Sequence, residues 1–550
     1  MKKIIIPLVI VAALILGGVL VFMRSGGESQ AAKLAPGESV FFVNIPNIPR
    51  TGFRWTGTAL ARIAAEPEVR AFMDMPLRQL KDAPGTDEAT NILVALKPGN
   101  IFMAATSESP GSTEGLLGFQ FWGNRKDYDN AVARLRRELP DAEQEPVKES
   151  HHGLEIIATR HGDRTLYTAA AGRWGFLSSE AQLIRDALDR ATNRPTSPAL
   201  SANPRFGKVI SQLPLDPDLL VFIQPDKALD SLLAAGQSLG AQAIPSQVEH
   251  LRATEALGGA LKLDGLLQRD AIFVLRPGDP ESAPKLMHRA MELTTGNTTL
   301  FLDFALNFAA LPAWVESLSE VYPGVAEPAL AFSQTIAEVY GPECALMGDW
   351  RDGSMVPSPL FAVLVKDAAR ATDLFRQTMG MVPGASLQEI EGTPVFTFPA
   401  QFTTLAVAQS DAFLVAGMDP EAVARAASRK DAVPTLASAP IFKPALTDFK
   451  QANEAFCFID TGTVFERLYG SLIPVLRFSA AMMPDINRRM DVSKIPQAST
   501  IFRHLPPITL SQRRTSDGTL VESSGPISMT QFLLIGGAVA ASANQSLFGR

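Results

Sequence analysis

Short apolar runs bounded by turn residues recur along the chain. Examples are VFFVNI at 40–45, NIFMAAT at 100–106 and LEIIATR at 154–160. Runs of this length and composition predict β-strands. Turn residues such as His152-Gly153 and Gly172-Arg173 separate neighbouring runs, so we expect hairpins and mainly antiparallel pairing.

Between these runs, apolar residues spaced three or four apart predict helices. Ala131, Leu135 and Leu139 have fourfold spacing, and a longer helical block is expected from Val464 to Met483. Strands in runs, interrupted by single helices, predict an α+β fold. We expect a mainly antiparallel sheet with helices packed on one face.

The same order of motifs occurs twice. DLLVFIQPDKALDSLL is followed 236 residues later by EAFCFIDTGTVFERLY, which matches Phe222 to Phe458. The same offset matches Phe206 to Phe442. A constant offset over several elements indicates a tandem duplication.

The duplication divides the chain into six segments. We predict α+β units at 38–278 and 297–525, each with an Asp-Gly turn late in its length, at Asp264 and Asp517. The other segments are an N-terminal transmembrane anchor at 1–24, a flexible stalk at 25–37, a connector at 279–296 and an uncharged apolar C-terminal segment at 526–550.

The first residues combine positive charge with an apolar run. Lys2 and Lys3 precede the uncharged run Ile4–Met23, and Arg24 follows it. Twenty residues at about 1.5 Å each cover roughly 30 Å of hydrocarbon, and the positive-inside rule places the N-terminus in the cytoplasm. We predict a single-pass anchor in the bacterial inner membrane. A cleaved signal peptide with its site near residues 29–31 is the alternative, and either interpretation exports the body.

A second uncharged stretch runs from Gly525 to Gly549. Its strongly apolar part, FLLIGGAVAASA at 532–543, has only 12 residues, which is short for a membrane span. We expect a buried or interfacial segment, with a second span as the alternative.

Composition narrows the function classes. The 550 residues are 46% hydrophobic and 19% charged, with a formal net charge of −7. This balance argues against wholesale disorder and against a nucleic-acid partner. Cys344 and Cys457 lack metal-ligand spacing and lie in apolar runs, so two buried free thiols are expected.

A histidine-rich stretch is the first candidate for a metal site. Its groups are Glu149, His151, His152, Glu155, His161 and Asp163. However, adjacent residues on a strand point to opposite faces, so His151 and His152 should rarely reach one ion. We therefore predict a surface hairpin turn and no metal.

Asp264 and Asp270, with Arg269 between them, form a candidate acid–base pair. Asp-Gly is also the strongest hairpin signal, which favours a structural role for this group. Asp303 and Asp460 end apolar strands, and Gln224 takes that place in the first unit. A polar residue there is typical of a turn or a helix cap, so no catalytic role is predicted.

The tryptophans are scattered along the chain, which favours core or groove aromatics, with a glycan- or peptide-binding groove as the alternative. They are Trp55, Trp122, Trp174, Trp314 and Trp350. The sequence contains no GxSxG, HExxH, GxxxxGK[ST], EF-hand or GxGxxG motif. We therefore predict no catalytic residue and no cofactor.

The early segment LAPGESVFFVNIP, the repeated strands that lead into helices and the late SDGTLVESSGP carry a likeness to a known family. In these segments the chain resembles uncharacterised bacterial membrane-anchored proteins grouped as a domain of unknown function. The resemblance implies the N-terminal span and the duplicated exported body, and it implies no activity.

From these features we expect a membrane-tethered, extracytoplasmic binding or scaffold protein of the bacterial envelope, and not an enzyme. Its partners would be the membrane and envelope proteins or lipids. A carrier or chaperone for apolar cargo, such as lipid or unfolded protein, is the first alternative. A hydrolase without a local motif is the second.

Overall fold

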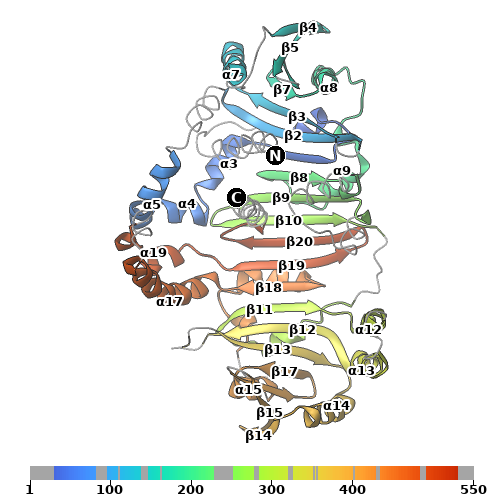
Figure 1. Ribbon diagram of the computed structural model, residues 1–550, viewed down its shortest axis with the longest axis vertical. Helices are drawn as coiled ribbons and strands as arrows, with labels where there is room; N and C mark the ends of the chain where they lie inside the picture. Colours follow the sequence, from blue (N-terminus) through green and yellow to red (C-terminus); the bar gives the residue numbers. More distant parts are fainter. Residues whose placement is uncertain are drawn as a thin grey trace.

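The computed structural model describes residues 30–81, 96–109, 112–137, 146–161, 164–227, 252–277, 284–319, 326–350, 354, 357–400, 403–428, 434–482 and 491–529. Within these ranges, 20 strands join into one sheet, and every strand pairing is antiparallel. The strands stack along the long axis of the molecule (Figure 1).

The first half of the sheet contains ten strands, which follow one another from the outer edge toward the middle of the molecule. In spatial order they are β4 (Val147–His151), β5 (Leu154–His161), β6 (Arg164–Ala171), β7 (Trp174–Ser178), β3 (Ser112–Phe121), β2 (Pro98–Ser109), β1 (Phe41–Ile45), β8 (Leu219–Ile223), β9 (Ala256–Asp264) and β10 (Leu267–Leu275).

The second half has the same spatial order. From the opposite edge inward its strands are β14 (Ser386–Ile390), β15 (Thr393–Ala400), β16 (Thr403–Gln409), β17 (Phe413–Gly417), β13 (Ser358–Val365), β12 (Tyr340–Asp349), β11 (Thr298–Ala305), β18 (Ala455–Ile459), β19 (Ile508–Thr515) and β20 (Gly518–Gly525). Each strand of the first half therefore has a counterpart ten places later in the chain.

The two halves meet where β10 pairs with β20, from Gln268 opposite Gly525 to Leu275 opposite Gly518. Leu520 of β20 is buried in the same cluster as Phe273 of β10, so the core of the first half extends across this joint. The body is therefore one continuous sheet, and not two sheets packed side by side.

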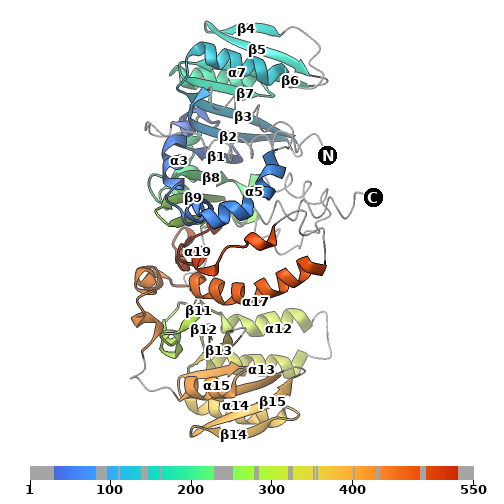
Figure 2. The ribbon, with the colours of Figure 1, turned by 90° about the vertical axis from the view of Figure 1, so that its left-hand side faces the viewer.

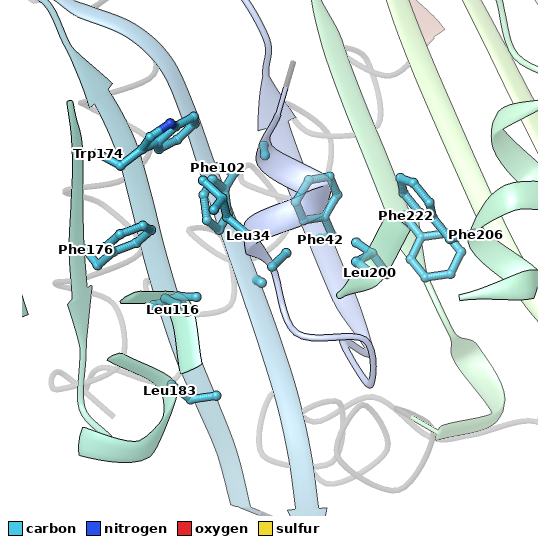
Figure 3. Close-up of a cluster of buried hydrophobic side chains, with 14 of the residues drawn as sticks. Leu34, Phe42, Phe102, Leu116, Trp174, Phe176, Leu183, Leu200, Phe206 and Phe222 are labelled. Carbon is cyan, nitrogen blue, oxygen red and sulfur yellow. The ribbon is translucent and has the colours of Figure 1, made fainter. Parts of the chain in front are cut away.

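Aromatic side chains fill the core of the first half (Figure 3). Phe206, from α9 (Pro204–Ile210), meets Phe222 of β8 edge-on with ring centroids 5.2 Å apart. In the second half Phe442 meets Phe458 of β18 in the same way at 5.1 Å. Strand β8 lies between β1 and β9, so both of its edges are paired, and Phe222 is buried because its side chain packs in the cluster that contains Phe206.

Helices cover both faces of the sheet. On one face α8 (Ala181–Ala191) packs on the main cluster that contains Phe102. On the other face α7 (Arg125–Arg137) covers a smaller cluster that includes Ile101. Successive residues of a strand face opposite sides, so the core is divided between two layers. The prediction of helices on one face only is wrong.

The predicted fold class needs a larger correction. The antiparallel sheet with helices agrees with the α+β class, but the N-terminal transmembrane helix has no support. Residues 4–23 lie outside the described residues. Among the residues that are described, no helix has both the length and the apolar character to cross a membrane. The fold class is corrected to a single 20-stranded antiparallel sheet with helices.

Two predicted segment boundaries also change. Residues 31–34, assigned to a stalk, form α2 (Ala31–Leu34), whose Ala31 and Leu34 lie in the first core. Residues 286–293, assigned to a connector, place Leu286 and Met291 in the second core. Both segments are short and apolar on one side, and burial of that side fixes them in the domain. The segment 530–550 lies outside the described residues.

Helices of the two halves also touch on the side that Figure 2 shows. Glu66, which follows α4 (Ala59–Ala65), faces His504 and Arg503 with oxygen–nitrogen distances of 2.6 Å. Glu68 of α5 (Pro67–Lys81) accepts hydrogen bonds from Gln497 N and Thr500 Oγ1 at 2.9 and 3.0 Å. These contacts hold α19 (Ala498–Phe502) against the first half.

Candidate binding surface

The helix α17 (Thr461–Met482) follows strand β18 in the middle of the molecule. Asp460 caps its first turn: one carboxylate oxygen accepts from the backbone N–H of Thr463 at 3.2 Å, and the other accepts from the Thr463 hydroxyl at 2.7 Å. The predicted capping role of Asp460 is confirmed. Gln224, at the end of β8, instead donates to Ser39 O at 2.8 Å.

One side of α17 packs on the protein. It contacts α19, and Tyr469 donates from its hydroxyl to the carbonyl of Pro496 at 2.6 Å. The ring of Phe465 lies 5.0 Å from the Tyr469 ring, one turn away. These contacts fix which face of the helix looks outward.

The outward face of α17 is apolar. We call it the apolar stripe, and its five side chains have exposed fractions of 41–69%: Leu468, Leu472, Val475, Phe478 and Met482. Positions separated by 4, 3, 3 and 4 residues fall within an arc of about 120° on a helix. Figure 2 shows α17 on the same side of the sheet as α12 (Leu311–Ser319) and α13 (Ala326–Val339). Large contiguous apolar surfaces of this kind mark interaction sites.

The charge near the stripe differs in sign from that of the whole chain. The helix itself, residues 461–482, contains two arginines and one glutamate, which gives +1, whereas the chain carries −7. Arg477 is exposed on α17, on the side opposite Leu468. The apolar stripe therefore lies on a helix whose own charge is positive.

A groove of about 880 Å³ lies near the start of α17, and its lining mixes apolar side chains with several charged groups. Asp349 accepts from the hydroxyls of Thr295 and Thr298 at 2.8 and 2.6 Å. Glu391 faces Arg425 across 3.9 Å. These carboxylates already have partners, and none of the described residues that line the groove is a histidine.

The histidine-rich stretch lies at the β4–β5 hairpin, as the sequence predicts. However, the expectation that His151 and His152 point to opposite faces is wrong. His152 and Gly153 have φ values of +49° and +80°, so both histidine rings turn toward Asp189 of α8. Both glutamates are in exposed ion pairs. Glu155 pairs with Lys148 at 2.6 Å, and Glu149 pairs with Arg185 at 3.0 Å. Asp163 lies outside the described residues, as does the side chain of His161.

Asp264 and Asp270 have structural roles. Asp264 lies in the β9–β10 turn and pairs with Arg269 at 3.0 Å. Asp270 is buried and accepts from Ser523 Oγ and from the backbone N–H of Met529. The two carboxylates therefore lie in different environments and do not form an acid–base pair.

Asp303 differs from the expectation most clearly. It lies inside β11 and is fully buried, and within the described residues neither carboxylate oxygen has a hydrogen bond. His288 Nδ1 is 3.6 Å from it, and Glu343 accepts from the N–H groups of Met287 and Ala290. Burial raises the pKa of Asp303, and burial together with the Asp303 charge raises the pKa of Glu343.

The tryptophans whose side chains are described do not line one groove. Trp174 is stacked with Phe176 in the core, and Trp122 lies under the guanidinium of Arg173 at 4.6 Å. Trp350 is buried and donates to Ser354 O at 2.9 Å. Trp55 is half-buried, and the side chain of Trp314 lies outside the described residues.

Both cysteines carry free thiols. Cys344 is buried and Cys457 is half-buried, on the two strands that flank β11. Burial raises the pKa of the Cys344 thiol to about 12 and that of Cys457 to about 11. Both thiols are therefore protonated and unreactive at neutral pH.

No family model matches the chain, and no curated protein does. Three solved structures of a protein titled TP0453, in crystal forms I, III and IV, share 10–11% identity with it and give TM-scores of 0.25–0.27. The matched region spans 45–46% of this chain and 79–81% of the TP0453 chain. Similarity at this level supports no inference about function.

Proposed function

We propose that this chain is an extracytoplasmic binding and scaffold protein of the bacterial envelope, which attaches to the surface of an anionic lipid bilayer through the apolar stripe of α17. The observation that carries the proposal is the exposure of five large apolar side chains along one face of a single helix. The uncharged run at 4–23 supports the envelope location through its likeness to an export signal.

The composition of the stripe favours lipid over a protein partner. The stripe consists of leucine, valine, phenylalanine and methionine side chains, with no tryptophan or tyrosine. Interfaces that bind proteins tightly are enriched in Trp, Tyr and Arg, and Leu and Val are under-represented there. An apolar face with a basic side chain on the opposite side, as Arg477 is here, is typical of helices that lie in the interface of an anionic bilayer.

The sheet suits the scaffold part of the proposal. Its two halves have the same strand order, and we propose that they descend from one duplicated unit. A stripe near the middle of the long axis would place the two halves on either side of the attachment point. The likeness to membrane-anchored proteins of unknown function is part of the same proposal.

Vesicle flotation tests the attachment. A chain that begins at Gln30, which separates α17 from the run at 4–23, is mixed with vesicles of phosphatidylglycerol and phosphatidylethanolamine. Leu472→Glu combined with Val475→Glu should lower the floating fraction by about 10-fold or more, because two charges would enter the apolar layer. Circular dichroism of each variant checks that it is folded.

Leu215→Glu is the matched control, because Leu215 is 86% exposed in the first half, away from α17. It should float as the unchanged chain does. Equal flotation of all three proteins, or no flotation of the unchanged chain, contradicts the proposal.

The carrier alternative finds less support. A carrier of lipid or unfolded protein needs an enclosed apolar cavity, whereas the groove near α17 is open and lined by Asp349, Glu391 and Arg425. An acyl chain or apolar peptide in this groove would lie against these charged groups, which is unfavourable.

A further inference from the structure

The turn between β4 and β5 brings two adjacent histidines to the same side. His151 is the last residue of β4 and pairs with Leu154. His152 and Gly153 form the turn in the left-handed region, where glycine carries no steric penalty. The chain reverses at His152 and Gly153, directly after His151, so the two rings do not alternate as they would in a strand, and the ring centroids are 4.4 Å apart.

A buried carboxylate meets both rings. Asp189 lies in the last turn of α8, and its side chain is 5% exposed. Its Oδ1 is 2.8 Å from His151 Nε2 and 3.9 Å from His152 Nε2. One nitrogen of each ring and a carboxylate oxygen all lie within 4.8 Å of one another.

These distances suit a tetrahedral metal ion. Zinc binds imidazole nitrogen and carboxylate oxygen at about 2.0–2.2 Å, so its ligand atoms lie roughly 3.3 Å apart. The two measured contacts of 2.8 and 3.9 Å bracket that separation. His152 is 54% exposed, which gives an ion access from solvent and leaves a fourth position for water.

Two positive groups beside the hairpin are already paired with carboxylates, and Arg190, next to Asp189, donates from its Nε to the carbonyl of Leu34 at 2.9 Å. Arg185 lies one turn before Asp189 on α8, and it donates to Glu149 at 3.0 Å. Lys148 pairs with Glu155 at 2.6 Å. Both of these positive groups therefore face a carboxylate of the hairpin.

The second half shows what a simple hairpin–helix contact looks like. Its β14–β15 turn has the same backbone, with φ values of +52° at Glu391 and +80° at Gly392. There the contact to the helix is a half-exposed pair of Glu391 and Arg425 at 3.9 Å. A hairpin can therefore pack on its helix without two histidines or a buried carboxylate.

We propose that His151, His152 and Asp189 form a zinc site on the first half, with two imidazole nitrogens and one carboxylate oxygen as ligands. The site is independent of the apolar stripe on α17. It replaces the expectation of a surface turn without metal.

Zinc titration of the full chain, purified with a tag that lacks histidine and stripped with a chelator, tests the proposal. A competing chromophore should report one zinc per chain. His152→Gln and Asp189→Asn should each weaken zinc binding by about 100-fold or more, since loss of an outer hydrogen-bond partner alone costs 10–100-fold. X-ray absorption of the zinc-loaded chain should show two imidazole ligands.

His161→Gln is the matched control. His161 lies at the far end of β5, about 23 Å along the strand from the turn, so this variant should bind zinc as the unchanged chain does. His152 is exposed, so His152→Gln should stay folded, and circular dichroism checks Asp189→Asn. Absence of binding at 100 µM zinc, or unchanged affinity in His152→Gln, overturns the proposal.

Discussion

Asp270 of β10 lies directly opposite Ser523 of β20, and the Ser523 hydroxyl donates to its carboxylate at 3.2 Å. Each of these residues comes six positions after the aspartate of its own Asp-Gly turn, at Asp264 and Asp517. If a two-fold axis relates the two halves, equivalent residues must face each other where the halves join. This relation supports the proposed duplication.

Asp270→Ala should destabilise the joint between the halves. The substitution leaves the Ser523 hydroxyl and the N–H of Met529 without the carboxylate that accepts from them. The expected loss is about 1–3 kcal/mol of unfolding free energy, measured by urea denaturation. Asp264→Ala, at an exposed turn, should change stability by under about 0.5 kcal/mol. Equal effects of the two substitutions would argue against a structural role for Asp270.

Much of the fold could be predicted from the sequence because strands and turns are local patterns. The Asp-Gly turns and the repeat of Phe222 at Phe458 are visible in the letters alone. The joint could not be predicted, because Asp270 and Ser523 are 253 residues apart and no local pattern specifies which edge strands pair. Burial of residues 31–34 and 286–293 also depends on distant surfaces.

Asp303→Asn should stabilise the protein at neutral pH. The carboxylate is buried without a hydrogen bond within the described residues, and an amide carries no charge to desolvate. The equivalent position in the first half carries an amide, Asn44. Asn44 lies two residues after Phe42, which pairs with Phe222. Asp303 likewise lies two residues after Phe301, which pairs with Phe458. We expect a gain of about 1–3 kcal/mol in thermal or urea unfolding.

The gain should depend on pH in a defined direction. Burial raises the folded-state pKa of Asp303 above its unfolded value, so the native state loses stability as pH rises from about 3.9 through the folded pKa. The advantage of Asp303→Asn should therefore be absent below about pH 4 and full above the folded pKa. Asn44→Asp should destabilise, because it removes the donors to Asn100 Oδ1 and Ile101 O. A loss of stability in Asp303→Asn at pH 8 would refute this account.

Phe222→Ala and Phe458→Ala should each cost roughly 3–5 kcal/mol, measured by chemical denaturation. Both rings are fully buried and each touches the equivalent aromatic partner, Phe206 or Phe442. Phe53→Ala, at a ring that is 60% exposed, serves as the control and should cost far less. Losses below about 1 kcal/mol at both buried positions would contradict their place in the core.

Glu66→Gln should loosen α19 from the first half. Hydrogen bonds from His504 and Arg503 hold the pKa of Glu66 below its ordinary value. The contact therefore stabilises the fold above the unfolded pKa and is lost as pH falls through the folded pKa. Hydrogen exchange at residues 498–504 should quicken in Glu66→Gln at pH 7. Glu338→Gln, which breaks the exposed pair with Arg370, should leave that exchange unchanged.

The apolar stripe could be predicted only in part. Periodicity indicates a helix at 464–483, but α17 is apolar on two faces, and the sequence does not show which of them packs on α19. The histidine site was missed for a different reason. Alternation along a strand does not apply at His152, which lies in the turn directly after His151, and Asp189 comes from a helix 38 residues away.

The most direct test of the central claim is an environment-sensitive fluorophore placed on α17. Val475→Cys on the stripe and Arg477→Cys on the far side of the same helix are labelled, while the native thiols stay protonated because burial raises their pKa values to about 12 and about 11. On addition of phosphatidylglycerol vesicles, the account predicts a blue shift and protection from an aqueous quencher at 475 and neither at 477. Equal emission and equal quenching at the two positions would contradict attachment through the apolar stripe.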